Sequence, residues 1–228
     1  MNRLFRTALV ASALLVTMPA SATTPRETLS VAAFQTTSRP AALASVRQAI
    51  AAAEAVLARD ANDREALLQR AVGIGYRAKL TRNAGDAKLS RKLFEALAAG
   101  NPRDPEGQLA LAGWHLDAIA DLGGLMAKMA LGAQRATGEA ALDRAVALGG
   151  NRAFFPGLAA MLRIRLDKTD VARSRALAER AVASAAPTPL DRLMRRDAQL
   201  LLPYLRKNDG AGAAAQARAM LPFGKLAK

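Results

Sequence analysis

The stretch from Asp104 to Gly124 constrains the fold of this chain most. Asp104 can cap a helix, Pro105 fits the first helical position, and Glu106 faces the positive end of the helix dipole. Gly123 and Gly124 then end the helix. Its apolar side chains form two rows, one at Leu109, Ala112, Leu116 and Ile119 and the other at Leu111, Trp114, His115, Ala118 and Leu122. A helix that is apolar on two flanks packs between two neighbours, as in a stacked helical array.

Similar spacing predicts helices along most of the remaining chain. Aromatic residues make up only 4% of the sequence and β-branched residues are sparse, so propensity favours helix and no strand is predicted. We predict an all-α fold of about eight or nine helices in one domain over residues 40–222. Two alternatives stay open for residues 125–148, which could form one long helix or two pieces broken near Gly138. Pro203 should kink or shorten the helix that contains it.

The two ends of the chain are predicted to lie outside this domain. Arg3 and Arg6 precede a short apolar run, and a small-residue site ends at Ala22, so residues 1–22 indicate a signal peptide cut after Ala22. The apolar run is shorter than the roughly 20 residues that cross a membrane, which disfavours the alternative of an N-terminal anchor. We expect a flexible lead-in over 23–39 and a tail over 223–228. The expected location is the periplasm, with secretion as the alternative.

The charge and the cysteine count limit the partners. The chain has a net charge of +14, which favours anionic partners. For an exported protein we expect no nucleic acid and instead phospholipid head groups, acidic polysaccharide or an acidic protein surface; the alternative is a basic surface without a dedicated ligand. The chain has no cysteine and one histidine, which excludes disulfides, zinc–cysteine sites and multi-histidine metal sites. We expect no cofactor and no membrane span in the mature chain.

Three segments, at 55–63, 93–102 and 142–151, each close a helix in the same way. Residues 180–182 also repeat the Arg-Ala-Val of residues 144–146. These segments resemble the second helix and closing turn of tetratricopeptide repeats, and the helices that follow each turn resemble the first helix of the next repeat. The resemblance implies a right-handed superhelix of stacked antiparallel helix pairs.

The resemblance covers roughly residues 40–187, and the repeats are unequal in length. They end near residues 61, 102, 150 and 187, at intervals longer than the 34 residues of the family. The sequence therefore implies degenerate repeats with lengthened helices.

Tetratricopeptide repeats bind extended peptides on the concave face formed by their first helices. The resemblance places the groove at Leu68, Val72 and Tyr76, at Leu109, Gly113 and Asp117, and at Gly157, Met161 and Arg165. Gly113 and Gly157 would let a ligand backbone approach closely. Tyr76, Asp117 and Arg165 would supply polar contacts, and Arg165 would bind a carboxylate. The alternative for each residue is an ordinary solvated helix face.

A second candidate surface is a basic patch formed by Arg192, Arg195, Arg196, Arg206 and Lys207. The first three lie within about one and a half turns of one helix, and the last two lie at its end, so an anionic surface could dock near the C-terminus. The sequence shows no apolar membrane-inserting face to pair with this patch. The alternative is a solvated face of scattered arginines.

The sequence favours a protein without catalytic activity. Trp114 and His115 are predicted to pack in the core, because no acid lies one turn from His115 to orient it as a base. Asp117 and Asp121 are the only close pair of acids on the central helix. A glycan-acting hydrolase, which needs paired carboxylates in a cleft, is thus a remote alternative.

The expected function is that of a non-catalytic periplasmic scaffold that binds a protein or peptide, with an acidic partner as one option. The alternative is a ligand-binding accessory subunit of a periplasmic substrate-uptake system, since an exported helical-repeat protein of this size is similar to the repeat-containing subunits of some such systems. A groove lined by Tyr76, Asp117 and Arg165 would favour the peptide, and an enclosed pocket near Trp114 would favour a small-molecule ligand.

Overall fold

A computed structural model describes residues 23–226, and this part of the chain is all-α, as predicted. It contains eleven helices and no strand: α1 Pro25–Phe34, α2 Arg39–Leu57, α3 Arg64–Thr81, α4 Ala84–Gly100, α5 Pro105–Leu122, α6 Gly124–Leu131, α7 Arg135–Leu148, α8 Phe154–Leu166, α9 Val171–Ala183, α10 Pro189–Arg206 and α11 Gly210–Met220. The prediction of eight or nine helices was thus too low. The predicted signal peptide lies outside the described residues.

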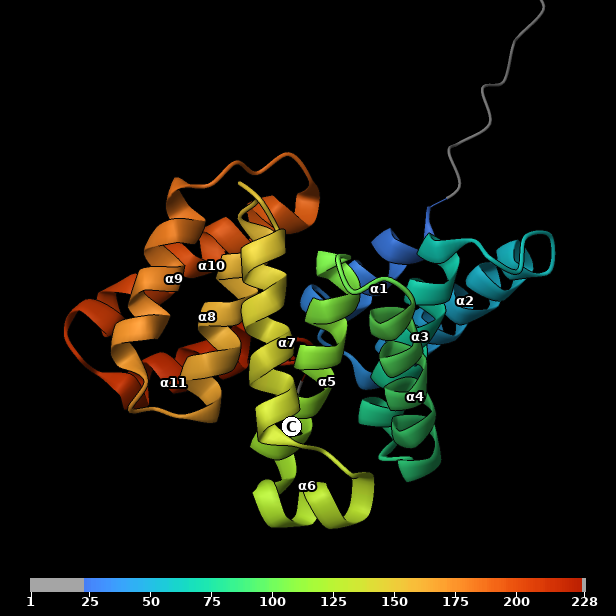
Figure 1. Cartoon of the computed structure of the whole chain (residues 1–228), viewed down its shortest axis with the longest axis horizontal. Coiled ribbons are helices and arrows are strands. Elements are labelled where there is room, and N and C mark those ends of the chain that lie inside the picture. Colours follow the sequence, from blue (N-terminus) through green and yellow to red (C-terminus); the bar gives the residue numbers. More distant parts are fainter. Residues whose placement is uncertain (1–22, 227–228) are drawn as a thin grey trace, which may run out of the picture.

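Neighbouring helices pack against one another along the chain (Figure 1). Helices α1–α4 form one side of the molecule, α8–α11 form the other, and α5 and α7 run between them (Figure 1). Helix α5 packs against α4, α7 and α8, and its Leu109, Ala112 and Leu116 are buried. The central helix is therefore enclosed by its neighbours, as its two apolar rows predict.

One additional helix is α1, which lies within the predicted flexible lead-in. Its N-terminus carries a reciprocal cap, because the Thr24 hydroxyl accepts a hydrogen bond from the Glu27 N–H and Glu27 accepts one from the Thr24 N–H. Its apolar side chains Leu29 and Phe34 are buried. The prediction of a flexible lead-in is wrong for residues 25–34, because this short apolar stripe packs against α2 and α3.

The other additional helix comes from the division of residues 125–148 into α6 and α7. The break lies at Gly132, which ends α6 with a φ of +73°, and not near Gly138. Gly138 instead lies inside α7 at its contact with α5, where an added Cβ would lie 2.7 Å from Leu116 Cδ2. Glycine here permits close packing of the two helices.

The C-terminal end of the described chain returns to its beginning. The Phe223 N–H donates a hydrogen bond of 2.7 Å to the Ala33 carbonyl in α1, and Phe223 is buried. Leu226 also packs against the core. The prediction of a tail is wrong for residues 223–226, because this segment contacts α1, about 190 residues earlier in the sequence. Helix α10 runs through Pro203 to Arg206, so it is not shortened there.

None of the helices in residues 23–226 is both long and apolar enough to cross a membrane.

Candidate partner-binding groove

A cavity of about 880 Å³ lies between α3, α5 and α8, and we call it the central groove. Its walls carry Leu68, Val72 and Tyr76 from α3, Leu109, Gly113, Trp114 and Asp117 from α5, and Leu158 and Leu162 from α8. Regular helical spacing brings side chains three or four residues apart to one face of each helix. Three helices that are distant in sequence thus line one space.

The structure places all six predicted groove residues of α3 and α5 on this space, but not those of α8. Met161 is fully buried, and Gly157 faces α10, where an added Cβ would lie 2.9 Å from the Met194 carbonyl oxygen. Helix α8 packs against α5, α9, α10 and α11, so its buried surface is wider than one stripe. Leu158 and Leu162 face the groove in their place. The predicted role of Gly157 in ligand approach is therefore wrong, since the glycine serves helix packing.

Arg165 does not line the central groove but binds two acids at its edge. Its guanidinium forms ion pairs with Asp117 and Asp121 of α5, and only 9% of its side chain is exposed. Carboxylates of the same chain therefore already pair with Arg165, and its binding to a ligand carboxylate stays a prediction.

Lys79 of α3 completes this cluster, which sequence reasoning missed. Its Nζ lies 2.5 Å from Asp117 Oδ2 and 3.4 Å from Asp121 Oδ2. Burial alone would raise the pKa of Asp117, but Lys79 and Arg165 more than offset this, so the pKa is lowered and Asp117 stays ionised. We call Lys79, Asp117, Asp121 and Arg165 the groove cluster. No sequence signal pointed to Lys79, because it reaches Asp117 only through the packing of α3 on α5.

Tyr76 lies next to this cluster and contacts the C-terminal segment. Burial raises the pKa of its hydroxyl, and the negative charge of Asp117 raises it further. The Tyr76 ring meets the Phe223 ring edge to face, with 5.0 Å between the ring centroids. Tyr76 therefore remains protonated and presents its ring to an aromatic neighbour.

Residues 221–224 and Leu226 form part of the groove wall. Helix α11 ends at Met220, and Phe223 has a φ of +66°, a region that residues other than glycine rarely adopt. The hydrogen bond to Ala33 and the contact with Tyr76 hold Phe223 in this conformation. A short non-helical segment of the chain itself therefore lies along the central groove.

Trp114 and His115 have different surroundings. Trp114 is half-buried, lines the groove and donates a hydrogen bond of 3.0 Å from Nε1 to the Ala87 carbonyl. His115 is buried, as predicted, and its Nδ1 accepts a hydrogen bond of 3.1 Å from the Gln134 N–H. Burial, together with the charge of Arg91, lowers the pKa of His115 to about 4. His115 is therefore a neutral packing residue at pH 7.

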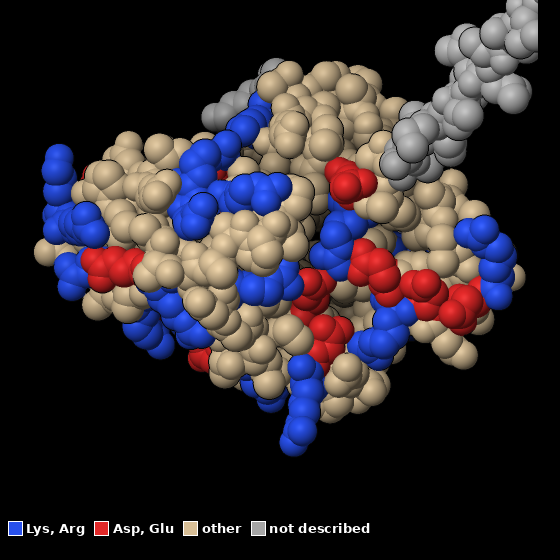
Figure 2. Space-filling view, turned by 90° about the horizontal axis from the view of Figure 1, so that it is seen from above, with Lys and Arg blue, Asp and Glu red and all other residues tan. Residues whose placement is uncertain are grey.

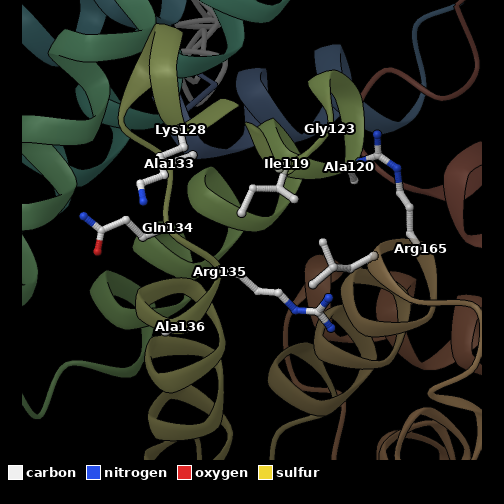
Figure 3. A pocket seen from close by; sticks show the side chains of 11 residues that line it. Ile119, Ala120, Gly123, Lys128, Ala133, Gln134, Arg135, Ala136 and Arg165 are labelled. Atoms are coloured by element: carbon white, nitrogen blue, oxygen red, sulfur yellow. The ribbon is translucent and has the colours of Figure 1, made fainter. Parts of the chain in front are cut away.

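A second hollow, of about 810 Å³, lies beside the C-terminal end of α5 (Figure 3). Arg135 reaches into it from the start of α7, Lys128 lies at its rim, and the Arg165 side chain points away towards α5 (Figure 3). Arg135 pairs with Glu139 at 2.9 Å, so its guanidinium already has an acidic partner within the chain.

A further set of charges joins the helix N-termini at the opposite end of α5. Arg26 pairs with Glu65 at 2.5 Å and with Glu106 at 2.6 Å, while Arg152 pairs with Glu106 at 3.2 Å and with Asp191 at 3.1 Å. We call these five residues the end cluster. Figure 2 looks onto this end of the molecule, where positive and negative side chains lie close together near the middle. The cluster links α1, α3, α5, α10 and the residues before α8.

The predicted basic patch lies on α10 and just beyond it. Arg196 pairs with Asp197 at 2.7 Å and Arg206 with Glu179 at 3.6 Å, whereas Arg192 donates to the Pro187 carbonyl. In Figure 2 the side formed by the C-terminal helices shows Lys and Arg side chains scattered among uncharged residues, with some Asp or Glu between them. The surface is basic, but part of its charge is paired within the chain.

Within residues 23–226, no group of three or more His, Asp or Glu side chains is arranged to hold a metal ion. Comparison with protein-family models, with curated proteins and with solved structures finds no match for this chain.

Proposed function

We propose that this protein is a non-catalytic periplasmic scaffold that binds a protein or peptide partner in the central groove. The observation that carries the proposal is that a non-helical segment of polypeptide, residues 221–226, already lies along this groove. The segment places the aromatic side chain of Phe223 against Tyr76 of the groove wall, and a main-chain hydrogen bond to Ala33 of α1 holds it there.

The arrangement of the groove supports a degenerate tetratricopeptide-like array. In the proposed register, α3, α5 and α8 are the first helices of three successive repeats, and these three helices line the groove. In such arrays the first helices form the concave binding face. The right-handed superhelix is part of the same proposal.

The groove cluster supports a binding role without chemistry. Asp117 and Asp121 lie one turn apart on the same helix, and Lys79 and Arg165 both pair with them. A glycan-acting hydrolase needs one carboxyl group that gives up a proton and a second one across the substrate. The lowered pKa of Asp117 makes it a poor proton donor.

A small-molecule ligand is the second candidate, as in an accessory subunit of a substrate-uptake system. The volume of about 880 Å³ falls within the range of roughly 300–1,000 Å³ that small-molecule sites occupy. Trp114 on the wall and the charged cluster at one end would supply stacking and polar contacts. Binding of a small ligand that excludes the peptide described below would favour this candidate.

Export is part of the main proposal. Cleavage after Ala22 would leave Thr24 free to cap α1, because the reciprocal cap needs only residues 24–27. N-terminal sequencing of the protein recovered from a periplasmic extract should begin at Thr23.

The test of the groove uses a fluorescent peptide with the sequence of residues 217–226. The chain's own segment competes with it at an effective concentration of about millimolar, so binding to the unmodified chain should be weak. In Phe223→Ala the internal competitor loses its anchor. We expect this variant to bind the peptide at least about tenfold more tightly, as measured by fluorescence anisotropy.

Two controls sharpen this test. A peptide whose Phe is replaced by Ala should not bind, and Val72→Glu in the Phe223→Ala background should abolish binding, because Val72 lies on the groove wall. Leu200→Glu changes an exposed side chain on α10 and should leave the affinity unchanged. Equal binding of both peptides, or no binding to the Phe223→Ala chain with its helical circular dichroism retained, would refute the proposal.

A further inference from the structure

Helix α6 carries the most exposed large apolar side chains of the described structure. Leu125 is 72% exposed, Met126 57% and Met129 74%, and Leu122 lies exposed just before the helix. The helix projects from the end of the molecule opposite to the end cluster (Figure 1). Soluble proteins seldom leave such neighbouring side chains uncovered unless the surface binds something.

Contacts on the opposite side of α6 hold the exposed face in position. Ala127 is the one fully buried residue of α6, and Arg91 of α4 donates hydrogen bonds of 2.9 Å and 3.1 Å to the carbonyls of Leu131 and Gly132. Gly123 and Gly132, with φ of +79° and +73°, make the sharp turns at the two ends of the helix. The chain thus fixes α6 with its apolar side chains turned outwards.

One lysine lies on α6, and two more lie on the neighbouring helix α4. Lys128 lies on α6 itself, and Lys88 and Lys92 lie on α4, each within one turn of Arg91, whose side chain contacts α6. All three are exposed, and none of them forms an ion pair within residues 23–226. Leu and Met side chains beside lysines match a membrane surface, because the apolar groups enter the acyl boundary and the ammonium groups meet lipid phosphates.

We propose that α6 is a docking site for an anionic phospholipid membrane, into which Leu125, Met126 and Met129 insert. Eight residues of helix extend only about 12 Å, so α6 lies in the interface and does not cross it. Ala130 and Leu131 also border the central groove, so docking would hold the groove beside the membrane.

A second copy of the chain fits this face less well. A stable dimer buries about 800 Å² on each partner, more than one short helix can offer. A twofold contact through α6 would also bring Lys128 close to its own copy, and like charges repel. The positive charge of the lysines on α4 and α6 and of the whole chain instead complements anionic lipid.

The chain contains no cysteine, so single cysteines can carry an environment-sensitive dye at chosen positions. We would label Met129→Cys with the dye NBD and add vesicles of 30% phosphatidylglycerol in phosphatidylcholine, or of phosphatidylcholine alone. The expected result is a blue shift and an increase in fluorescence with the anionic vesicles only, reduced by 0.5 M NaCl. The matched control, Leu200→Cys on α10, should show neither change.

Flotation of the unlabelled protein with the same vesicles gives a second measurement. Leu125→Ser with Met129→Ser should reduce the bound fraction at least about tenfold, because both side chains lose most of their apolar area. Leu200→Ser should have no effect. The proposal is overturned if the unmodified protein does not float, if the double variant floats equally well, or if sedimentation equilibrium shows a dimer that the double variant abolishes. None of these outcomes affects the peptide measurement at the central groove.

Discussion

The end cluster and the groove cluster lie at opposite ends of α5 and are built from similar parts. At the first turn of α5, Glu106 binds Arg26 from α1 and Arg152 from the residues before α8. In the last turns of α5, Asp117 binds Lys79 from α3 and Arg165 from α8. In both places an acid on the central helix is held by basic residues that come from both sides of the molecule.

The two clusters differ in how deeply their acids are buried, although residues of both line the central groove, Arg26 and Glu106 in one cluster and Asp117 and Asp121 in the other. In the end cluster, the Asp191 side chain is completely buried and accepts hydrogen bonds from the Thr188 hydroxyl at 2.6 Å, the Phe154 N–H at 3.0 Å and Arg152. The groove cluster borders an open cavity, and Asp117 and Asp121 share the same two basic partners. The comparison suggests that a completely buried acid such as Asp191 serves stability, whereas partly exposed acids at the cavity, such as Asp117 and Asp121, can meet a ligand.

The largest expected effect is that of Asp191→Ala, which tests the structural role of the end cluster. Removing Asp191 leaves the Phe154 N–H without its acceptor and Arg152 with Glu106 alone, so we expect a loss of about 3–5 kcal/mol in the free energy of unfolding. Urea denaturation measures it. Glu179→Ala, at the exposed pair with Arg206, should cost about 1 kcal/mol or less. A similar loss in the free energy of unfolding for both variants would remove the distinction between buried and exposed ion pairs.

The next effect is the loss of stability in acid. His115, which lies on α5 between the two clusters, should lower the free energy of unfolding in a pH range of its own. Its pKa is lowered from an unfolded value of about 6.5 to about 4, so the unfolded chain binds the proton first. The stability from neutral His115 is complete above about pH 6.5 and falls by about 3 kcal/mol as the pH drops to about 4.

Asp191 contributes at lower pH. Burial would raise the pKa of Asp191, but the hydrogen bonds from Thr188, Arg152 and the Phe154 N–H outweigh this effect, so the pKa is lowered. The contribution of ionised Asp191 to the free energy of unfolding is therefore lost only below about pH 4. Unfolding measured from pH 7 to 3 should therefore show two steps, and His115→Asn should remove the upper one. A His115→Asn chain with an unchanged slope between pH 6.5 and 4 would assign that step to other groups.

A smaller effect on stability than that of Asp191→Ala is expected for Asp117→Asn in the groove cluster. Asp121 remains within ion-pair distance of Lys79 and Arg165, so we expect a loss of about 1 kcal/mol in the free energy of unfolding. Affinity for the groove peptide should change more clearly, since Asp117 lines the groove. A loss as large as that of Asp191→Ala would show that the groove cluster is structural too.

Local signals explain which parts of this fold could be predicted from the sequence. Helix α5 begins after Asp104 and ends before Gly123, within a residue of the prediction, because capping depends on residues close in sequence. The groove positions on α3 and α5 were predicted from the register of the tetratricopeptide resemblance together with helical spacing, and on these two helices the predicted residues line the cavity. The same spacing failed on α8, where neighbours on several sides bury Met161 and leave Leu158 at the groove.

Contacts between distant residues explain the rest. Phe223 meets Ala33 and Tyr76, and Lys79 meets Asp117, but no periodicity or cap near these residues signals their partners. Helix α1 was missed because its buried stripe spans only Leu29 to Phe34. The outward apolar face of α6 was hidden because its residues continue the helical pattern of residues 125–148.

The hydrogen bond from Phe223 to Ala33 changes how this array should come apart. In an open row of repeats each unit contacts only its neighbours, so the terminal units can fray on their own. Here the last residues close onto the first helix, and each end is released only with the other. We therefore expect the amides of α1 and α11 to exchange at similar, slow rates, because both helices open in the same event.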